Sequence, residues 1–181
     1  MDLKETKLRR INSYHGIIVN VTMDQARIAD GSVRLREVVE HPGGVCVLPV
    51  DENGDAWCVR QFRYPVQQVL LEAPAGKLEP GEDPVPAAER ELGEETGFTA
   101  GKLIPLGAYY PSPGFSTECL HLYLALELTR GDAHPDDGEL LDLVRIPLSE
   151  LTAMVMAGEV PDSKTAQLAL HAEKLLREMK G

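Results

Sequence analysis

Residues 84–96 carry the most sharply bounded helix signal of the chain. Asp83 can cap the N-terminus, Pro84 suits the first helical position, and Gly97 suits the left-handed residue that ends a helix. Because each helical residue advances by about 100° around the axis, fixed ends also fix which side chains share a face. The packing of this helix therefore limits how the other elements can be arranged.

Three glutamates share one sector of the predicted helix. Glu91 and Glu95 lie about 40° apart, and Glu94 lies about 60° from Glu91 on its other side. The adjoining sector is apolar and consists of Val85, Ala88 and Leu92. Carboxylates that border the core repel one another unless a cation neutralises them, and hard oxygen ligands suit Mg²⁺ or Mn²⁺. The alternative interpretation is a solvated helix face.

The negative charge of the chain is concentrated in two short segments. Of the formal net charge of −11, residues 76–98 contribute −5 and residues 131–142 another −5, so the remainder is nearly neutral. An acidic protein without a local basic patch repels nucleic acid and anionic membranes, which argues against both as partners. The two acidic segments are instead candidates for a metal or phosphoryl site.

The N-terminal part of the chain, residues 1–41, is predicted to form an antiparallel β unit. Two runs rich in β-branched residues, 17–22 and 33–39, are separated by the turn signal at residues 30–32. The Pro- and Gly-rich segment 41–44 then interrupts the strand pattern. We therefore place a domain boundary near residue 41.

Residues 42–181 are predicted to form the main domain. The run 45–50 is apolar on both faces, as in a central buried strand, and residues 56–63 are expected to form a hairpin with it through the turn at 51–55. The remaining elements are predicted as strands over 102–110, 118–128 and 140–146 and helices over 148–157 and 163–179.

The helix also lies inside a spaced motif. Gly76 is followed after five residues by Glu82 and, after seven more, by RELGEETGF from Arg90 to Phe98. At average residue frequencies, chance occurrence in a chain of this length is on the order of 10⁻⁷. The motif resembles the Nudix hydrolase signature at every specified position, and Gly93, at an unspecified position, is its one unusual residue.

The resemblance implies an α/β fold, a Nudix-like α/β/α sandwich with a mixed sheet, in which the motif binds metal and a diphosphate. By position, Glu91 and Glu95 match the principal metal-ligand carboxylates, and the backbone carbonyl of Ala75 matches an additional ligand. Glu94 matches a further ligand and is also a catalytic candidate. Arg90 matches the arginine that orients the catalytic carboxylates. The implied cofactor is Mg²⁺, with Mn²⁺ as the alternative.

The flanks of the motif resemble the ADP-ribose pyrophosphatase branch of the family, upstream over residues 59–65 and 71–76 and downstream over residues 110–118. This resemblance implies Mg²⁺-dependent hydrolysis of ADP-ribose to AMP and ribose 5-phosphate. The alternatives are hydrolysis of another nucleoside diphosphate sugar, such as GDP-mannose or ADP-glucose, and a non-catalytic sensor of nucleotide sugars. The N-terminal β unit of this branch usually contributes to a homodimer.

Within these flanks the resemblance implies substrate-binding roles for Arg63, Pro113 and Glu118. The guanidinium of Arg63 fits phosphate oxygens, although it could equally anchor a loop. Glu118 could instead be a surface strand residue. Glu79 is a possible auxiliary metal or catalytic group, and Glu82 matches a motif glutamate whose role is either structural or metal-related.

A mobile acidic loop supplies the general base in this branch. Aligning residues 136–142 places Glu139 at the base position, with Asp137 as the next choice and a solvated turn as the alternative.

Cys46, Cys58 and Cys119 are odd in number and lack metal-ligand spacing, so they predict buried thiols in a reducing compartment. Residues 1–10 lack an apolar signal region, and we expect a cytoplasmic protein.

Overall fold

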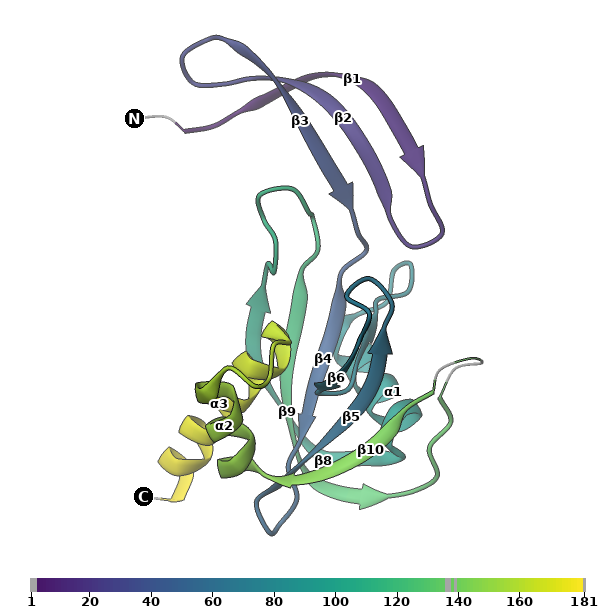
Figure 1. Cartoon of the computed structure of the whole chain (residues 1–181), viewed down its shortest axis with the longest axis vertical. Helices are drawn as coiled ribbons and strands as arrows, with labels where there is room; N and C mark the ends of the chain where they lie inside the picture. The colour runs from purple at the N-terminus through teal and green to yellow at the C-terminus, as the bar shows by residue number, and fades with distance from the viewer. Residues whose placement is uncertain (1–2, 136–137, 139, 181) are drawn as a thin grey trace. The chain divides into compact units, whose positions relative to one another are not determined.

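The structure is a computed structural model and describes residues 3–135, 138 and 140–180. It divides into two compact units (Figure 1). The first contains the residues up to Gly43 together with Tyr110–Cys119, and the second contains Gly44–Tyr109 and the residues from Leu120 onward. The segment 110–119 thus joins a unit that is otherwise formed by the N-terminal residues.

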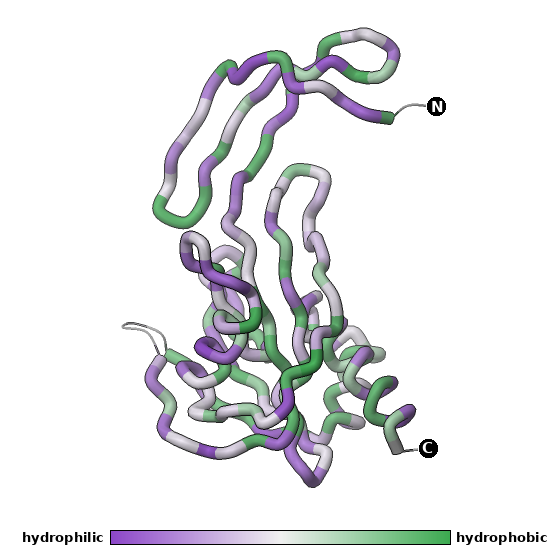
Figure 2. Tube along the Cα trace, turned by 180° about the vertical axis from the view of Figure 1, so that it is seen from behind, coloured by the Kyte–Doolittle hydropathy of each residue, from purple (hydrophilic) through white to green (hydrophobic). Residues whose placement is uncertain are grey.

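The first unit contains a three-stranded antiparallel sheet. Its strands lie in the order β1 (Thr6–His15), β2 (Asn20–Arg27) and β3 (Val33–Glu40). The predicted strand at 17–22 is wrong in its first half, because Ile17 lies in the turn between β1 and β2, a hydrophobic loop in Figure 2, and is fully exposed. Antiparallel pairing of β2 with the polar strand β1 places the chain reversal there.

The second unit contains two further sheets. A mixed sheet holds, in order, β7 (Ala75–Lys77), β4 (Gly44–Pro49), β9 (Leu120–Arg130) and β8 (Phe98–Tyr109). An antiparallel sheet holds, in order, β10 (Asp142–Pro147), β5 (Asp55–Arg63) and β6 (Gln68–Glu72). The β4–β9 pair is parallel, which makes the first sheet mixed as predicted.

The expected hairpin between the strands at 45–50 and 56–63 is wrong in its pairing. The turn forms, with the N–H of Asp51 donating to the carbonyl of Asp55 at 2.9 Å. The two strands then join different sheets, and only the bridge between Val50 and Ala56 connects them among the described residues. The edges of β4 are already paired with β7 and β9, so β5 pairs with β6 and β10 instead.

Among the described residues, three helices complete the second unit: α1 (Pro84–Thr96), α2 (Leu148–Ala157) and α3 (Ser163–Lys180). The bounds predicted for α1 and α2 are confirmed, and Gly97 adopts the left-handed conformation, with φ 72°, that ends α1. In the part of the chain that the structure describes, no helix is both long and apolar enough to cross a membrane.

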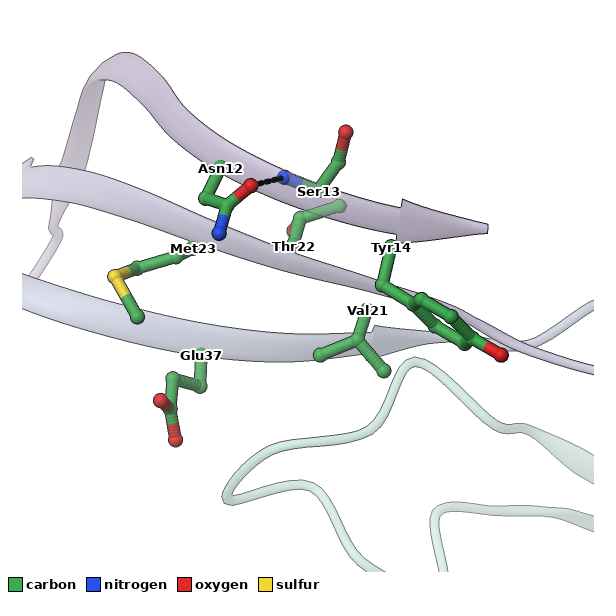
Figure 3. Close-up of a pocket in the computed structure, with 7 residues that line it drawn as sticks. All are labelled: Asn12, Ser13, Tyr14, Val21, Thr22, Met23 and Glu37. Atoms are coloured by element: carbon green, nitrogen blue, oxygen red, sulfur yellow. Dashed lines mark hydrogen bonds between the residues drawn. The ribbon is translucent and has the colours of Figure 1, made fainter. Parts of the chain in front are cut away.

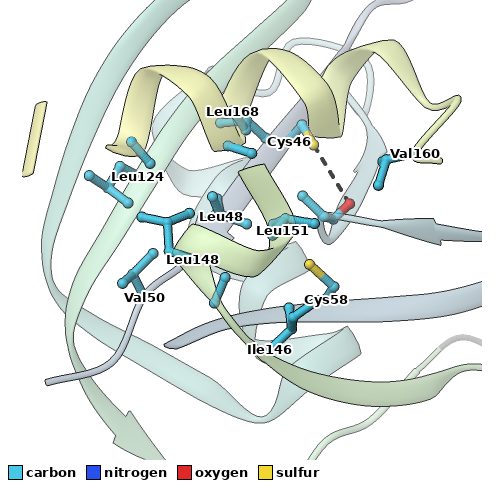
Figure 4. Packing of buried hydrophobic residues seen from close by; sticks show 14 of the residues in the cluster. Cys46, Leu48, Val50, Cys58, Leu124, Ile146, Leu148, Leu151, Val160 and Leu168 are labelled. Carbon is cyan, nitrogen blue, oxygen red and sulfur yellow. Dashed lines mark hydrogen bonds between the residues drawn. The ribbon is translucent and has the colours of Figure 1, made fainter. Parts of the chain in front are cut away.

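Strand β4 is buried at all six positions and separates two apolar layers. Cys46 and Leu48 pack with residues of α2 and α3 (Figure 4), whereas Val45 and Val47 pack with residues of α1. Burying one aliphatic side chain of this size contributes about 1.5–3 kcal/mol. The predicted α/β/α sandwich is confirmed, and it fixes α1 against one face of the mixed sheet.

Candidate active site

Helix α1 brings its glutamates to the edge of the core. Glu91 and Glu95 are buried, with 9% and 6% of their surface exposed, whereas Glu94 is half-buried. The apolar sector differs from the prediction in one residue, because Val85 is 49% exposed and Ala87 takes its place in the core. Alanines next to β4 let the helix approach the sheet closely, which draws the adjacent carboxylates inward.

Strand β7 lies against two of these carboxylates. The N–H of Ala75 donates to Oε2 of Glu95 at 3.1 Å. The backbone of Gly76 faces Glu91 so closely that a Cβ atom on Gly76 would overlap the Glu91 carboxylate. Ala75, Glu91 and Glu95, which the resemblance assigns to one metal site, are therefore neighbours in the structure.

Arg90 binds three motif glutamates with a single guanidinium. Its Nε and Nη2 donate to the two carboxylate oxygens of Glu82 at 3.0 and 3.1 Å. Its Nη1 donates to Glu91 at 2.8 Å and to Glu94 at 2.9 Å. The hydrogen bonds to Arg90 lower the pKa of Glu82 and, with Glu82 as the largest contributor, raise that of Arg90. Arg90 thus fixes the positions of Glu82, Glu91 and Glu94 relative to one another.

The donor set suits a hard cation. Carboxylate oxygens of Glu91, Glu94 and Glu95 and the carbonyl of Ala75 are the kind of ligands that Mg²⁺ takes. Among the described residues, no group of three or more His, Cys, Asp or Glu side chains is gathered closely enough to hold a metal ion. Arg90 supplies the positive charge between Glu91 and Glu94 in this arrangement, so ligation would require these side chains to reorient.

Glu79 and Glu82 have different surroundings. Glu82 binds Arg90 and also accepts the N–H of Glu79 at 2.9 Å, so it closes the loop before α1. Glu79 is exposed. The motif position of Glu82 allows either a structural or a metal-related role, and its hydrogen bonds match the structural one.

Arg63 forms a bidentate ion pair with Glu72. Its Nε and Nη2 donate to the two oxygens of Glu72 at 2.7 and 2.8 Å, and Glu72 is 1% exposed. Burial alone would raise the pKa of Glu72, but Arg63 and Lys164 outweigh burial and hold this pKa below its usual range. The anchoring role considered for Arg63 is therefore present, and any phosphate contact must use the remaining guanidinium edge.

The other predicted site residues lie elsewhere. Pro113 and Glu118 belong to the first unit, where Pro113 is exposed and Glu118 lies 3.9 Å from Nδ1 of His41. Glu139 and Asp137 lie outside the described residues. A hollow of about 100 Å³ lies on the N-terminal sheet (Figure 3). It is lined by Asn12, Ser13, Tyr14, Val21, Thr22, Met23 and Glu37.

The predicted burial of the cysteine thiols is confirmed for two of the three. Cys46 and Cys58 lie in the core, and burial raises the pKa of Cys58 to about 12. Cys119 is only partly buried, because it lies at the end of the segment 110–119 instead of inside a strand.

Sequence reasoning missed Glu72, Asp162, Lys164 and Thr165 as residues linked to the site. The N–H of Ala73 donates to the hydroxyl of Thr165 across 92 positions of sequence, and Lys164 reaches Glu72 across the same separation. The one local signal is Asp162 directly before α3, where a capping residue is expected.

Comparison with known proteins places these residues in a family. A profile of the NUDIX domain matches residues 40–167. The ADP-ribose pyrophosphatase of Bacillus subtilis (strain 168) is 39% identical over 166 residues, which cover 91% of this chain and 90% of that protein. The methanol dehydrogenase activator of Bacillus methanolicus is 35% identical over 164 residues, covering 90% of this chain and 89% of that protein.

A GDP-mannose pyrophosphatase of Pectobacterium atrosepticum is 33% identical over 186 residues, covering 95% of this chain and 93% of that protein. The crystal structure of an "ADP compounds hydrolase" has the same fold, with a TM-score of 0.86 at 21% identity, covering 99% of this chain and 98% of that one. The NUDIX profile spans more than half of the chain and includes the whole acidic motif, so this protein belongs to the NUDIX family.

Proposed function

We propose that this protein hydrolyses the diphosphate of ADP-ribose to AMP and ribose 5-phosphate in a Mg²⁺-dependent reaction. The observation that carries the proposal is the buried pair Glu91 and Glu95 on α1, held by Arg90 and β7. The 39% identity to the Bacillus subtilis ADP-ribose pyrophosphatase, over nine tenths of both chains, supports the substrate.

In the proposed site, Glu91, Glu95 and the carbonyl of Ala75 hold the cation, and Glu94 is a further ligand or catalytic group. A divalent cation bound there screens the diphosphate charge, polarises the phosphoryl oxygens and lowers the pKa of the attacking water. Mg²⁺ is the proposed ion and Mn²⁺ the alternative. Arg90 bridges Glu91, which faces β7, and Glu94, and so holds these two carboxylates in place.

The remaining steps are assigned to residues outside α1. Glu139 accepts the proton of the water that attacks phosphorus, and the bridging P–O bond breaks to release the two products. Arg63 contacts a substrate phosphate through the guanidinium edge that Glu72 does not use. For Pro113 and Glu118 we retain the substrate-binding roles that the resemblance implies.

A panel of substrates tests this assignment. Purified protein with Mg²⁺ is given ADP-ribose, GDP-mannose and ADP-glucose separately, and nucleoside monophosphate release is measured. We expect the highest kcat/KM with ADP-ribose and AMP as its nucleotide product. Efficient cleavage of another compound without AMP release from ADP-ribose would contradict the assignment.

GDP-mannose is the second candidate substrate, because the Pectobacterium atrosepticum relative bears the name of that activity. A regulatory protein that binds a nucleotide sugar without cleaving it is the remaining alternative, and the Bacillus methanolicus relative is named as an activator of another enzyme. The presence of every motif glutamate argues against it. Nucleotide-sugar binding by calorimetry without product formation would identify that alternative.

The N-terminal sheet supports a proposed homodimer. Its strands leave large apolar side chains exposed: Leu8, Ile11, Tyr14, Val33 and Leu35. Large contiguous apolar patches on a protein surface mark interaction sites. We assign this surface to a second copy of the chain in the cytoplasm, and sedimentation equilibrium measures the expected doubled mass.

A further inference from the structure

A network of charged and polar side chains joins the start of α3 to the chain segment that leads into β7. Glu72, at the end of β6, accepts hydrogen bonds from Arg63 and from Nζ of Lys164. Lys164 also donates to Oδ1 of Asp162 at 2.8 Å. Two basic and two acidic groups thus neutralise one another. The side chains of Glu72, Lys164 and Asp162 are largely buried, at 1%, 14% and 14% exposure, and that of Arg63 is 38% exposed.

Asp162 organises the first turn of α3. Its Oδ2 accepts both the N–H and the hydroxyl of Thr165, at 3.0 and 2.5 Å. A carboxylate at the N-cap that accepts the N–H three residues later is a standard way to fix the start of a helix. The hydroxyl of Thr165, a fully buried residue, is therefore held in one orientation.

The oxygen of that hydroxyl accepts the N–H of Ala73 at 2.7 Å. Ala73 is buried and lies two residues before Ala75, whose N–H binds Glu95. Two residues of extended chain span only about 7 Å, so a shift of Ala73 is transmitted to Ala75 and Gly76. Those two residues are the part of β7 that faces Glu95 and Glu91.

We infer that Thr165 and Lys164 are positioning residues for the carboxylate site, acting through Ala73 and β7 from the opposite face of the sheet. The inference rests on the proposed metal-dependent function. Without the Thr165 hydroxyl, the buried amide of Ala73 loses its acceptor and has to move toward another one. The amide and carbonyl of Ala75 then leave the positions that match Glu95.

Two substitutions at the same position isolate the hydroxyl. Thr165→Val keeps the shape of the side chain and removes the acceptor, whereas Thr165→Ser keeps the acceptor. Outer-shell changes typically lower metal affinity 10- to 100-fold. By electron paramagnetic resonance titration of the full-length protein with Mn²⁺, we expect the dissociation constant to rise about tenfold in Thr165→Val and to stay within about threefold of wild type in Thr165→Ser.

A matched control separates positioning from general destabilisation. Thr152 is also a buried helical threonine, but its hydroxyl donates to the carbonyl of Leu148 within α2. We expect Thr152→Val to lower the melting temperature without changing Mn²⁺ affinity. In kinetics, Thr165→Val raises the Mg²⁺ concentration needed for half-maximal rate, while kcat at saturating Mg²⁺ falls less.

The outcomes distinguish the inference from the proposed function. If Thr165→Val binds Mn²⁺ as tightly as the wild type does, the inference is wrong and the proposed function is unaffected. Absence of Mn²⁺ binding by the wild type overturns the proposed metal site and this inference with it, whereas cleavage of a different nucleotide sugar overturns only the substrate. If Thr165→Val does not fold, Lys164→Met takes its place, because it removes the link between Glu72 and Asp162. The same Mn²⁺ titration is then expected to show the same rise in the dissociation constant.

Discussion

Arg90 explains how three carboxylates can share one edge of the core. Like charges at helical spacing destabilise a helix by a few tenths of a kcal/mol per pair, and the planar fork of arginine meets two or more carboxylates at once. Nη1 of Arg90 lies within 2.9 Å of both Glu91 and Glu94. Arg90 and the glutamates whose repulsion it relieves therefore lie on successive turns of the same helix.

Glu95→Gln tests the ligand role of the buried carboxylate. Glutamine keeps an oxygen that can accept the Ala75 N–H but removes the negative charge, so we expect folding to be retained and kcat/KM to fall by about 10²-fold or more. Glu89→Gln, on the exposed face of the same helix, is the control. Near wild-type activity of Glu95→Gln at limiting Mg²⁺ would refute the ligand role.

Glu72→Gln tests the buried ion pairs. Removing this charge leaves Arg63 and Lys164 without their shared partner, and we expect a loss of about 3 kcal/mol in unfolding free energy at pH 7. The pKa of Glu72 in the folded protein lies below its ordinary value of 4.5. The ionised Glu72 carboxylate therefore contributes fully to the free energy of unfolding above about pH 4.5, and this contribution is lost as the pH falls through the folded-state pKa.

Urea denaturation of the wild type and Glu72→Gln at several pH values measures this dependence. The difference in unfolding free energy is expected to shrink steadily below about pH 4.5. A difference that stays constant down to pH 3 would show that the ion pairs do not stabilise the protein.

At the scale of secondary structure, local signals and distant contacts differ in what the sequence reveals. The ends of α1 were predictable because Pro84 and Gly97 act within one turn. The exposed turn at Ile17 and the separation of β4 from β5 were not, since each depends on which strand pairs with which. The same reason hides the ion pair of Glu72 with Lys164, which joins two elements far apart in the chain.

Two glycine substitutions test the contact between α1 and β7. A Cβ on Gly76 would overlap the Glu91 carboxylate, so we expect Gly76→Ala to displace Glu91 and lower kcat/KM by about 10²-fold. Gly93 lies inside α1 with room for a Cβ, and Gly93→Ala is expected to stabilise the protein by about 1 kcal/mol.

Thermal melts and steady-state kinetics of both variants measure these effects. Wild-type kinetics in Gly76→Ala would show that the Glu91 carboxylate does not depend on its position against β7. A lower melting temperature in Gly93→Ala would contradict the account of that helix position.

For the whole molecule, the net charge of −11 is largely a property of two segments. One is the acidic face of α1 with its preceding loop, and the other includes the proposed base Glu139. A cation that binds only the folded protein stabilises it, by about 2.7 kcal/mol at a concentration 100 times its dissociation constant. We expect the melting temperature to rise with Mg²⁺ in the wild type and much less in Glu95→Gln, and an equal rise in both proteins would place the binding elsewhere.

The most direct test of metal-dependent hydrolysis at α1 is product analysis in ¹⁸O-labelled water. Wild type and Glu95→Gln are incubated with ADP-ribose and Mg²⁺, and the products are identified by mass spectrometry. The account predicts equal amounts of AMP and ribose 5-phosphate from the wild type, one ¹⁸O atom in one of the two, and almost no product from Glu95→Gln. Absence of AMP in the wild-type reaction, or undiminished product from Glu95→Gln, would contradict it.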